Sequence, residues 1–131
     1  IRLRYRLGPA RLLCWAVADA DSDRLIGGIT LFAINLEQGR AEIGYALHSS
    51  QWGRGHARNV LGKVLDHAFG PLGLRRIEAD IDPRNAASCR LVERLGFVRE
   101  GLLRERWRVG GDLQESAMYG LLAREWLGAS R

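Results

Sequence analysis

The segment 41–69 constrains the fold more than any other part of the sequence. It begins with AEIGYAL, in which Ile43, Tyr45 and Leu47 alternate with smaller or polar residues, as expected of a β-strand with one buried face. A stretch with two glycines, WGRGHA, follows, and the apolar residues then recur at helical spacing until Gly70-Pro71 ends the pattern. A strand that leads through glycines directly into a helix predicts a sheet that carries helices.

The front of this predicted helix has no Ser, Thr, Asp or Asn next to its first turn. A helix start leaves unpaired N–H groups at the positive end of the helix dipole, and glycines at 53 and 55 let a phosphate come close to them. Two interpretations follow from these residues alone: a bound anion takes the place of the missing cap, or the glycines form a simple turn, which is the more common case. The sequence has no Walker loop, which would need Gly-Lys-Ser/Thr at the helix start. It also has no dinucleotide fingerprint, which would need a third glycine where Arg58 stands.

The rest of the chain alternates between strand and helix patterns. Strands are predicted at 12–18 and 25–34, joined by an Asp/Ser turn, and at 75–82, where apolar and acidic residues alternate. A short helix is predicted between a cap at Asn85 and a glycine stop at Gly96, followed by two long strands around Gly110-Gly111-Asp112. The order is β-β-β-α-β-α-β-β, and without repeats or linkers residues 1–131 are expected to form a single domain.

Composition narrows the classes of partner. The net charge of +5 is spread along the chain, which suits an anionic ligand. No nucleic acid is expected, because the sequence lacks a basic recognition helix and aromatic-interleaved strands. No membrane partner is expected, because no apolar run approaches the roughly 18 residues of a span, and the cytoplasm is the default location. The three histidines have no metal-ligand spacing, so no metal site is predicted.

Three motifs in order, AEIGYAL, WGRGHA and RIEADIDPRNAASCRLVERLGF, resemble the GNAT superfamily of acyl-CoA-dependent N-acetyltransferases. Within it they resemble the RimJ/RimL-type branch, which acetylates protein N-termini, and the likeness covers about residues 25–126. The resemblance implies an α/β (α+β) fold with a mixed, mostly antiparallel central sheet. It also implies a splayed parallel pair of strands within that sheet and helices on both faces.

The resemblance further implies that acetyl-CoA (coenzyme A) is the cofactor. The loop matching the family pattern Gln/Arg-x-x-Gly-x-Gly/Ala would cradle the pyrophosphate, and it consists of Trp52, Gly53, Arg54, Gly55, His56 and Ala57. Trp52 stands where the family often has Gln or Arg. The strand residues expected to pair through their backbone with the pantetheine arm are Tyr45, Ala46 and Leu47, with an amide near Leu47 polarising the thioester carbonyl. Asn85 would contact the cofactor, cap its helix, or do both.

Aminolysis of a thioester needs a neutral amine and, for a poor leaving group, a proton for the departing thiolate. Many superfamily members use a Tyr of the second helix as the acid, but Val92 stands at that position here. Ser88 is the candidate instead, because it fits the Asn-x-x-Ser pattern of the RimJ/RimL branch and faces inward, where it would also contact the cofactor. The alternative is an ordinary serine bonded to a backbone carbonyl one turn back.

The candidate base is Asp80, five residues before Asn85, where related enzymes carry a carboxylate. Glu42 is the second candidate, and its parity opposite to Tyr45 and Leu47 counts against it unless a bulge re-aims it. The alternative for either carboxylate is a solvated charge. Glu115 and Tyr119 are considered for the acceptor groove, with packing favoured for Tyr119.

The family normally begins with a strand followed by two helices that wall the acceptor site. Here IRLRYRL leads within a few residues into PARLLCWAV, so these helices are missing near residues 7–9. Either the protein lacks them or the sequence joins two segments across a missing stretch. We favour the second, because a domain without that wall leaves one sheet face bare.

Together these expectations describe an acetyl-CoA-dependent N-acetyltransferase that transfers acetyl directly to a primary amine. The first candidate acceptor is a protein or peptide N-terminus, and a small amine such as a polyamine or an antibiotic is the alternative. The rival from another class is a non-catalytic CoA-binding regulatory module, which would keep WGRGHA and lose the acid and the base. A homodimer is one assembly considered.

Overall fold

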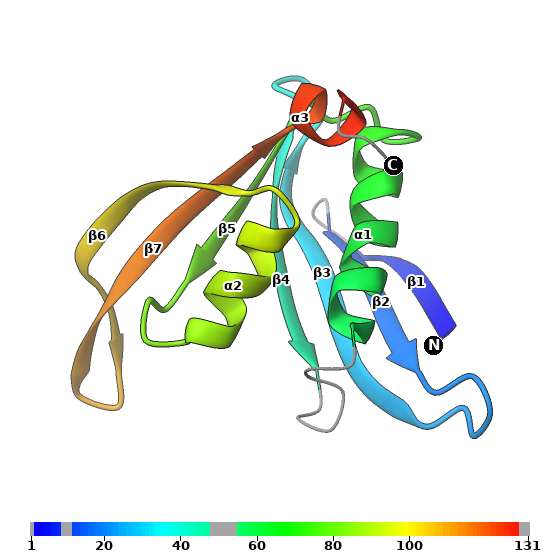
Figure 1. Ribbon diagram of the computed structural model, residues 1–131, viewed down its shortest axis with the longest axis horizontal. Coiled ribbons are helices and arrows are strands. Elements are labelled where there is room, and N and C mark those ends of the chain that lie inside the picture. The colour runs from blue at the N-terminus through cyan, green and yellow to red at the C-terminus, as the bar shows by residue number, and fades with distance from the viewer. Residues whose placement is uncertain (1, 9–11, 48–54, 129–131) are drawn as a thin grey trace.

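The computed structural model describes residues 2–8, 12–47 and 55–128. Figure 1 shows one sheet with helices packed against it. The elements along the described chain are β1 Arg2–Gly8, β2 Leu12–Ala18, β3 Leu25–Asn35, β4 Arg40–Leu47, α1 His56–Phe69, β5 Arg76–Ile81, α2 Ala86–Arg94, β6 Val98–Val109, β7 Asp112–Leu122 and α3 Ala123–Gly128. All eight predicted elements are therefore present, and β1 and α3 are added to them.

The strands lie in the order β1-β2-β3-β4-β5-β7-β6. Every neighbouring pair is antiparallel except β4 and β5, which are parallel. The predicted mixed, mostly antiparallel sheet with one parallel pair is confirmed. The two helices were expected to be missing near residues 7–9. Leu7 and Gly8 end β1 and pair with Leu13 and Leu12 of β2, and residue 9 lies outside the described residues.

The parallel pair is short and then opens. β4 and β5 are in register only through Arg40↔Arg76, Ala41↔Ile77 and Glu42↔Glu78. Beyond Glu42 the two strands diverge, and α2 lies over the side of the opening that faces the viewer in Figure 1. The splayed pair that the family resemblance implies is thus a feature of this sheet.

The core lies between the sheet and helices α1 and α2. Strand β5 buries Ile77, Ala79 and Ile81 and leaves its acidic side chains on the opposite face, as its alternation predicts. Helix α1 buries the face predicted from its spacing, which includes Val60, Leu61, Val64 and Leu65. Burial of a Val or Leu side chain contributes about 1.5–3 kcal/mol relative to exposure, so this one interface supplies much of the stability of the domain.

The described helices cover one face of the sheet, whereas helices on both faces were expected. Helices α1 and α2 lie side by side on the same face in Figure 1. The opposite face, called the open face below, carries Phe32, Glu42, Asp80 and Met118, which the strand register places on one side. No helix in the described ranges is long and apolar enough to cross a membrane.

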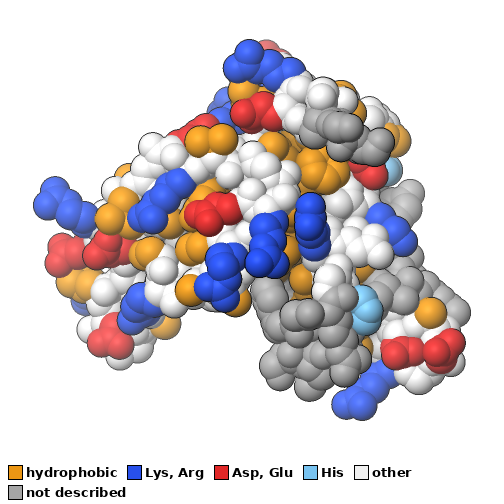
Figure 2. Space-filling model, in the orientation of Figure 1, with side chains coloured by type: hydrophobic (Ala, Val, Ile, Leu, Met, Phe, Trp, Pro, Cys, Tyr) orange, Lys and Arg blue, Asp and Glu red, His pale blue; other side chains and the backbone are white. Residues whose placement is uncertain are grey.

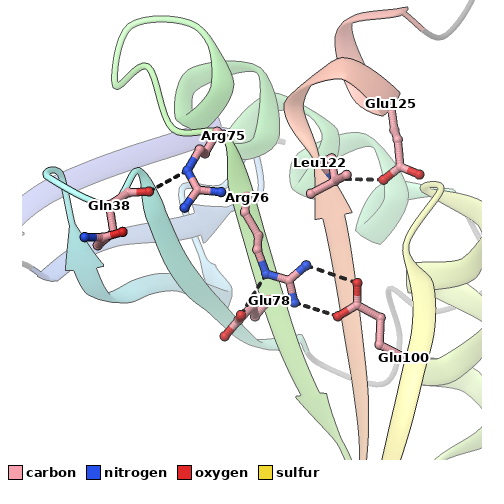
Figure 3. Close-up of polar contacts among 7 residues, drawn as sticks. All are labelled: Gln38, Arg75, Arg76, Glu78, Glu100, Leu122 and Glu125. Atoms are coloured by element: carbon pink, nitrogen blue, oxygen red, sulfur yellow. Dashed lines mark hydrogen bonds and ion pairs between the residues drawn. The ribbon is translucent and has the colours of Figure 1, made fainter.

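Polar contacts connect strands β5 and β6 of the sheet (Figure 3). Arg76 of β5 donates to Glu78 at 2.8 Å and to both carboxylate oxygens of Glu100 on β6, at 3.0 and 2.6 Å. This contact passes over Gly120 of β7, where an added Cβ would lie 2.6 Å from a carboxylate oxygen of Glu100. The glycine therefore leaves room for an ion pair that links β5 to β6 across the intervening strand.

Candidate active site

The start of α1 has no side-chain cap, as the sequence predicts. Gly55 takes the N-cap position with φ 77°, and no side chain there accepts a bond from the first turn. A Cβ added to Gly55 would meet nothing within 4 Å, so the left-handed backbone rather than crowding favours glycine. His56 opens the helix and is half-buried, while Trp52, Gly53 and Arg54 lie outside the described residues.

A pocket of about 490 Å³ adjoins this helix start. Three arginine side chains line it, Arg58 from α1 with Arg90 and Arg94 from α2, together with Gly55, Ala57, Ala87 and Leu91. Figure 2 shows a group of Lys and Arg side chains between α1 and α2. Helix N–H groups and guanidinium groups both bind phosphate oxygens, so the pocket suits a ligand with several phosphates.

A second, smaller cavity of about 230 Å³ lies in the gap between β4 and β5. Its lining includes Tyr45 and Ser88, which lie on the helix side of the sheet, and Asp80, which lies on the open face. Asn85 also lines it. Residues from both faces of the sheet therefore line this cavity, which lies where the pairing of β4 with β5 ends.

Tyr45 and Ser88 meet inside this gap. Their hydroxyl oxygens lie 2.5 Å apart, and either can be the donor. Ser88 is only 6% exposed, so its hydroxyl faces inward as predicted and bonds a side chain rather than a carbonyl one turn back. Burial raises the pKa of Tyr45, while the hydrogen bond with Ser88 acts in the opposite direction. The pair offers two hydroxyl protons next to the gap.

Asn85 caps α2, as the sequence predicts. Its Oδ1 accepts a hydrogen bond from the N–H of Ser88 at 3.1 Å. This cap fixes the first turn of α2, from which Ser88 points into the gap and Ala87 into the arginine-lined pocket. Ala46 and Leu47 follow at the end of β4, beyond its last pairing with β5.

The open face carries a third pocket, of about 470 Å³. Both candidate bases line it, with Asp80 from β5 and Glu42 from β4. The side chain of Glu42 lies on the opposite face of the sheet from that of Tyr45, as its position in the strand predicts. Asp80 lies on the same face as Glu42, so its position in the strand does not count against Glu42 as a base. Burial raises the pKa of Glu42, and the carboxylates of Glu78 and Asp80 raise it further, while Arg106 acts against this shift.

The pocket also contains residues that sequence reasoning missed. The indole N–H of Trp107 donates to Asp80 Oδ2 at 3.1 Å and to Ser116 Oγ at 2.9 Å. The lining residues of this pocket and of the arginine-lined pocket that the sequence did not point to include Arg106, Trp107, Ser116, Arg58, Arg90 and Arg94. Only the four-residue spacing of Arg90 and Arg94 on α2 was a usable signal.

The two residues considered for the acceptor groove differ. Glu115 lines the open-face pocket. Tyr119 is 1% exposed and donates its hydroxyl to Glu93 at 2.7 Å, so it packs in the core, as favoured from the sequence.

The described residues fit coenzyme A. The uncapped helix start and the three arginines match its phosphates, and the adjoining gap, which shares the first turn of α2, matches a narrow arm that carries a thioester. Two features carry this fit: the N–H and guanidinium groups that bind phosphate, and the opening between β4 and β5.

The chain is similar to known N-acetyltransferases. An uncharacterized N-acetyltransferase of Bacillus licheniformis, p20, is 42% identical over 108 residues, which are 82% of this chain and 61% of that protein. A putative ribosomal N-acetyltransferase of Bacillus subtilis, YdaF, is 34% identical over 104 residues, 79% of this chain and 57% of that protein. The chain thus spans about three fifths of the length of these curated relatives.

The fold is shared with a solved enzyme. The dodecameric structure of spermidine N-acetyltransferase from Vibrio cholerae superposes with a TM-score of 0.85 at 30% identity, covering 94% of this chain and 71% of that one. The family model for the acetyltransferase (GNAT) domain matches residues 3–98. Acetyl-CoA is the acyl donor of that family. Because the match spans most of the sequence and includes the uncapped helix and the splayed strands, the chain belongs to the GNAT acetyltransferase family.

Proposed function

We propose that this chain performs acetyl-CoA-dependent N-acetylation of a primary amine. The observation that carries the proposal is the cavity between β4 and β5, which has Asp80 on one side of the sheet and the Tyr45–Ser88 pair on the other. An amine that enters from the open face and an acyl donor that enters from the helix face would meet there. A proton acceptor for the amine and a proton donor for the departing thiolate would then lie on opposite sides of the reacting centre.

The donor would be held mainly by α1 and α2. The first turn of α1 and the side chains of Arg58, Arg90 and Arg94 would bind its phosphates. The main chain of Tyr45, Ala46 and Leu47 would bind the pantetheine arm, because β4 has no pairing with β5 beyond Glu42 in the described structure. When bound, acetyl-CoA supplies an acetyl group already activated as a thioester.

The side chains around the gap would move the protons. Asp80 takes a proton from the acceptor ammonium so that the amine attacks in its neutral form, and Glu42 is the second candidate for this task. Ser88 Oγ holds the proton destined for the leaving sulfur, and Tyr45 Oη stands 2.5 Å behind it. The cap formed by Asn85 keeps Ser88 in place.

For the acceptor we propose a protein or peptide N-terminus, as in the RimJ/RimL-type branch. The capped Asn85-x-x-Ser88 turn and the similarity to a putative ribosomal N-acetyltransferase support this choice. A polyamine is the second candidate. It is favoured by the open-face pocket, where neither Glu42 nor Asp80 forms a salt bridge with the described residues, and by the similarity to a spermidine N-acetyltransferase.

Thiol release from acetyl-CoA tests the reaction and the acceptor together. We would offer the full chain a peptide with a free N-terminus, the same peptide with a blocked N-terminus, and spermidine. Release with the free peptide but not the blocked one, with one acetyl group found on the peptide by mass spectrometry, is the expected result. Release with spermidine alone selects the second candidate. Calorimetric binding of CoA without release for any amine would instead identify a non-catalytic CoA-binding module.

We also propose self-association, in the first instance a homodimer. The dodecameric assembly of the Vibrio cholerae enzyme supports oligomerisation of this fold. Sedimentation velocity over a range of protein concentrations tests it, and a single monomeric species at every concentration would exclude it.

A further inference from the structure

We propose that Trp107 is a positioning residue for the base: its indole N–H orients the carboxylate of Asp80 for proton transfer. The proposal rests on the proposed function, because Trp107 has this task only if Asp80 takes a proton from the acceptor. Asp80 is on β5 and Trp107 is on β6, with β7 between them, so the contact spans two strand spacings.

The contact is anchored at a second point. The same N–H donates to Asp80 Oδ2 at 3.1 Å and to Ser116 Oγ at 2.9 Å. Ser116 is fully buried even though it lies on the open face, and it belongs to β7, the strand that Asp80 pairs with at Met118. The one indole N–H is thus shared between two acceptors in a three-centre hydrogen bond, and the buried Ser116 is one of them. Ser116 therefore holds the indole where it can reach Asp80.

An irregularity in β6 brings Trp107 to this position. Leu103 pairs with Ser116, but Trp107 pairs with Gln114, so three residues of β6 stand against one of β7. A regular ladder continued from Leu103 would pair Trp107 with Asp112. The bulge therefore shifts Trp107 by two positions along β7, about 7 Å at 3.3–3.4 Å per residue, toward Asp80. A shift of that size separates a hydrogen bond from no contact.

The backbone of the bulge is itself unusual. Glu105 has φ 50°, a left-handed backbone conformation that residues other than Gly, Asn and Asp rarely adopt. Such conformations persist where the surrounding structure imposes them, and they cluster at functional sites. Here the strained residue lies in the segment that displaces Trp107.

A neutral donor suits the chemistry of this pocket. Arg76 pairs with Glu78, and Arg84 pairs with Asp82, so neighbouring carboxylates are bound by cations. A cation held against Asp80 would compete with the positively charged acceptor, whereas an indole N–H orients the carboxylate and leaves its charge in place. Within the described residues Asp80 Oδ1 accepts no hydrogen bond, so that oxygen is available to take the proton.

Trp107→Phe tests the proposal, because it keeps an aromatic ring and removes the N–H. Trp126→Phe is the matched control, since the Trp126 indole N–H also donates to an aspartate, Asp66, at 2.9 Å, but at α1. We expect Trp107→Phe to lower kcat roughly 10- to 100-fold, the scale of a misaligned reacting group, with KM for the amine and the affinity for CoA unchanged. Trp126→Phe should retain the parent kcat.

A direct readout of the contact complements the kinetics. The indole ¹H–¹⁵N signal that disappears in Trp107→Phe should shift in Asp80→Asn, while the signal of Trp126 should not. An unshifted Trp107 signal, or a parent-level kcat in Trp107→Phe, would overturn the proposal while acetyl transfer by the parent chain stands. If the parent chain itself transfers no acetyl group, the proposed function is wrong, and the role proposed for Trp107 is wrong with it.

Discussion

The hydroxyl oxygens of Tyr45 and Ser88 lie 2.5 Å apart and join β4 to α2 at the edge of the gap in the sheet. If Ser88 supplies the proton for the leaving group, Ser88→Ala should lower kcat by roughly 10²-fold or more, the usual range for a general acid. Tyr45→Phe should lower it less, because the serine hydroxyl remains. Steady-state rates of thiol release at saturating amine measure both.

The double variant shows whether the two hydroxyls act together. Groups that act as a unit are not additive, so Tyr45→Phe combined with Ser88→Ala should be no slower than Ser88→Ala alone. Parent rates in both single variants would remove the pair from the mechanism. Calorimetry with CoA in each variant separates lost chemistry from lost binding.

The arginine-lined pocket predicts weaker CoA binding when its cations are removed. Arg90→Ala and Arg94→Ala should each lower the affinity for CoA about tenfold, equal to about 1.4 kcal/mol, since each removes a charge-assisted contact to phosphate. Calorimetric titrations at two salt concentrations measure this, and the loss should be larger at low salt. Arg108→Ala is the control, because Arg108 is exposed on β6 and outside the pocket. Equal affinity in all three variants would contradict the assignment.

The ion pair of Arg76 and Glu100 predicts a stability that depends on pH. Arg76 lowers the pKa of Glu100 through its hydrogen bonds, so the pair stabilises the fold above the unfolded-state pKa of Glu100 and this stabilisation is lost as pH falls through the folded-state pKa. Glu100→Gln should lower the free energy of unfolding near pH 7 by about 0.5–1 kcal/mol, a small value because the Glu100 side chain is 43% exposed.

Urea unfolding of the parent chain and the variant at about pH 7 and about pH 3 checks this, with the difference expected to shrink at the lower value. Glu37→Gln, in the exposed β3–β4 turn, is the control and should change little at either pH. A difference that grows on acidification would show that the pair does not stabilise the fold.

Glu42 predicts a change of the opposite sign. Its pKa is raised, first by burial and then by Glu78 and Asp80, so the stability it contributes is present below its unfolded-state pKa and is lost as pH rises through the folded-state value. Glu42→Gln should therefore raise the free energy of unfolding near pH 7 by about 0.2–0.5 kcal/mol, a small value because the side chain is only partly buried and solvent screens its charge. The gain should vanish on acidification in the same urea experiment. A variant that is less stable than the parent at neutral pH would contradict this account.

Local patterns in the sequence predicted much of this structure. Alternation located β5 and its buried residues, helical spacing located the buried face of α1, and Asn85 marked the start of α2, because each of these signals depends on neighbours in the chain. The family resemblance supplied the parallel pair and its opening.

The contacts that build the site depend on distant residues and were not predictable in this way. Nothing in the sequence indicates that Arg58 of α1 faces Arg90 of α2, because the packing angle of the helices decides it. The partner of Ser88 is 43 residues away on another element. Trp107 reaches Asp80 through a bulge that no alternation pattern reveals, since its register is set by β7.

The brief pairing of β4 with β5 has a mechanical consequence. Within the described residues, three residue pairs are all that join β4 to β5 edge to edge, so the two parts of the sheet on either side of them share only a short ladder. A ligand arm that hydrogen-bonds to the edges of both strands beyond Glu42 would bridge them as an additional strand does. A bound donor would then connect the two parts of the sheet. The donor substrate would itself help to hold Asp80 and Ser88 in position.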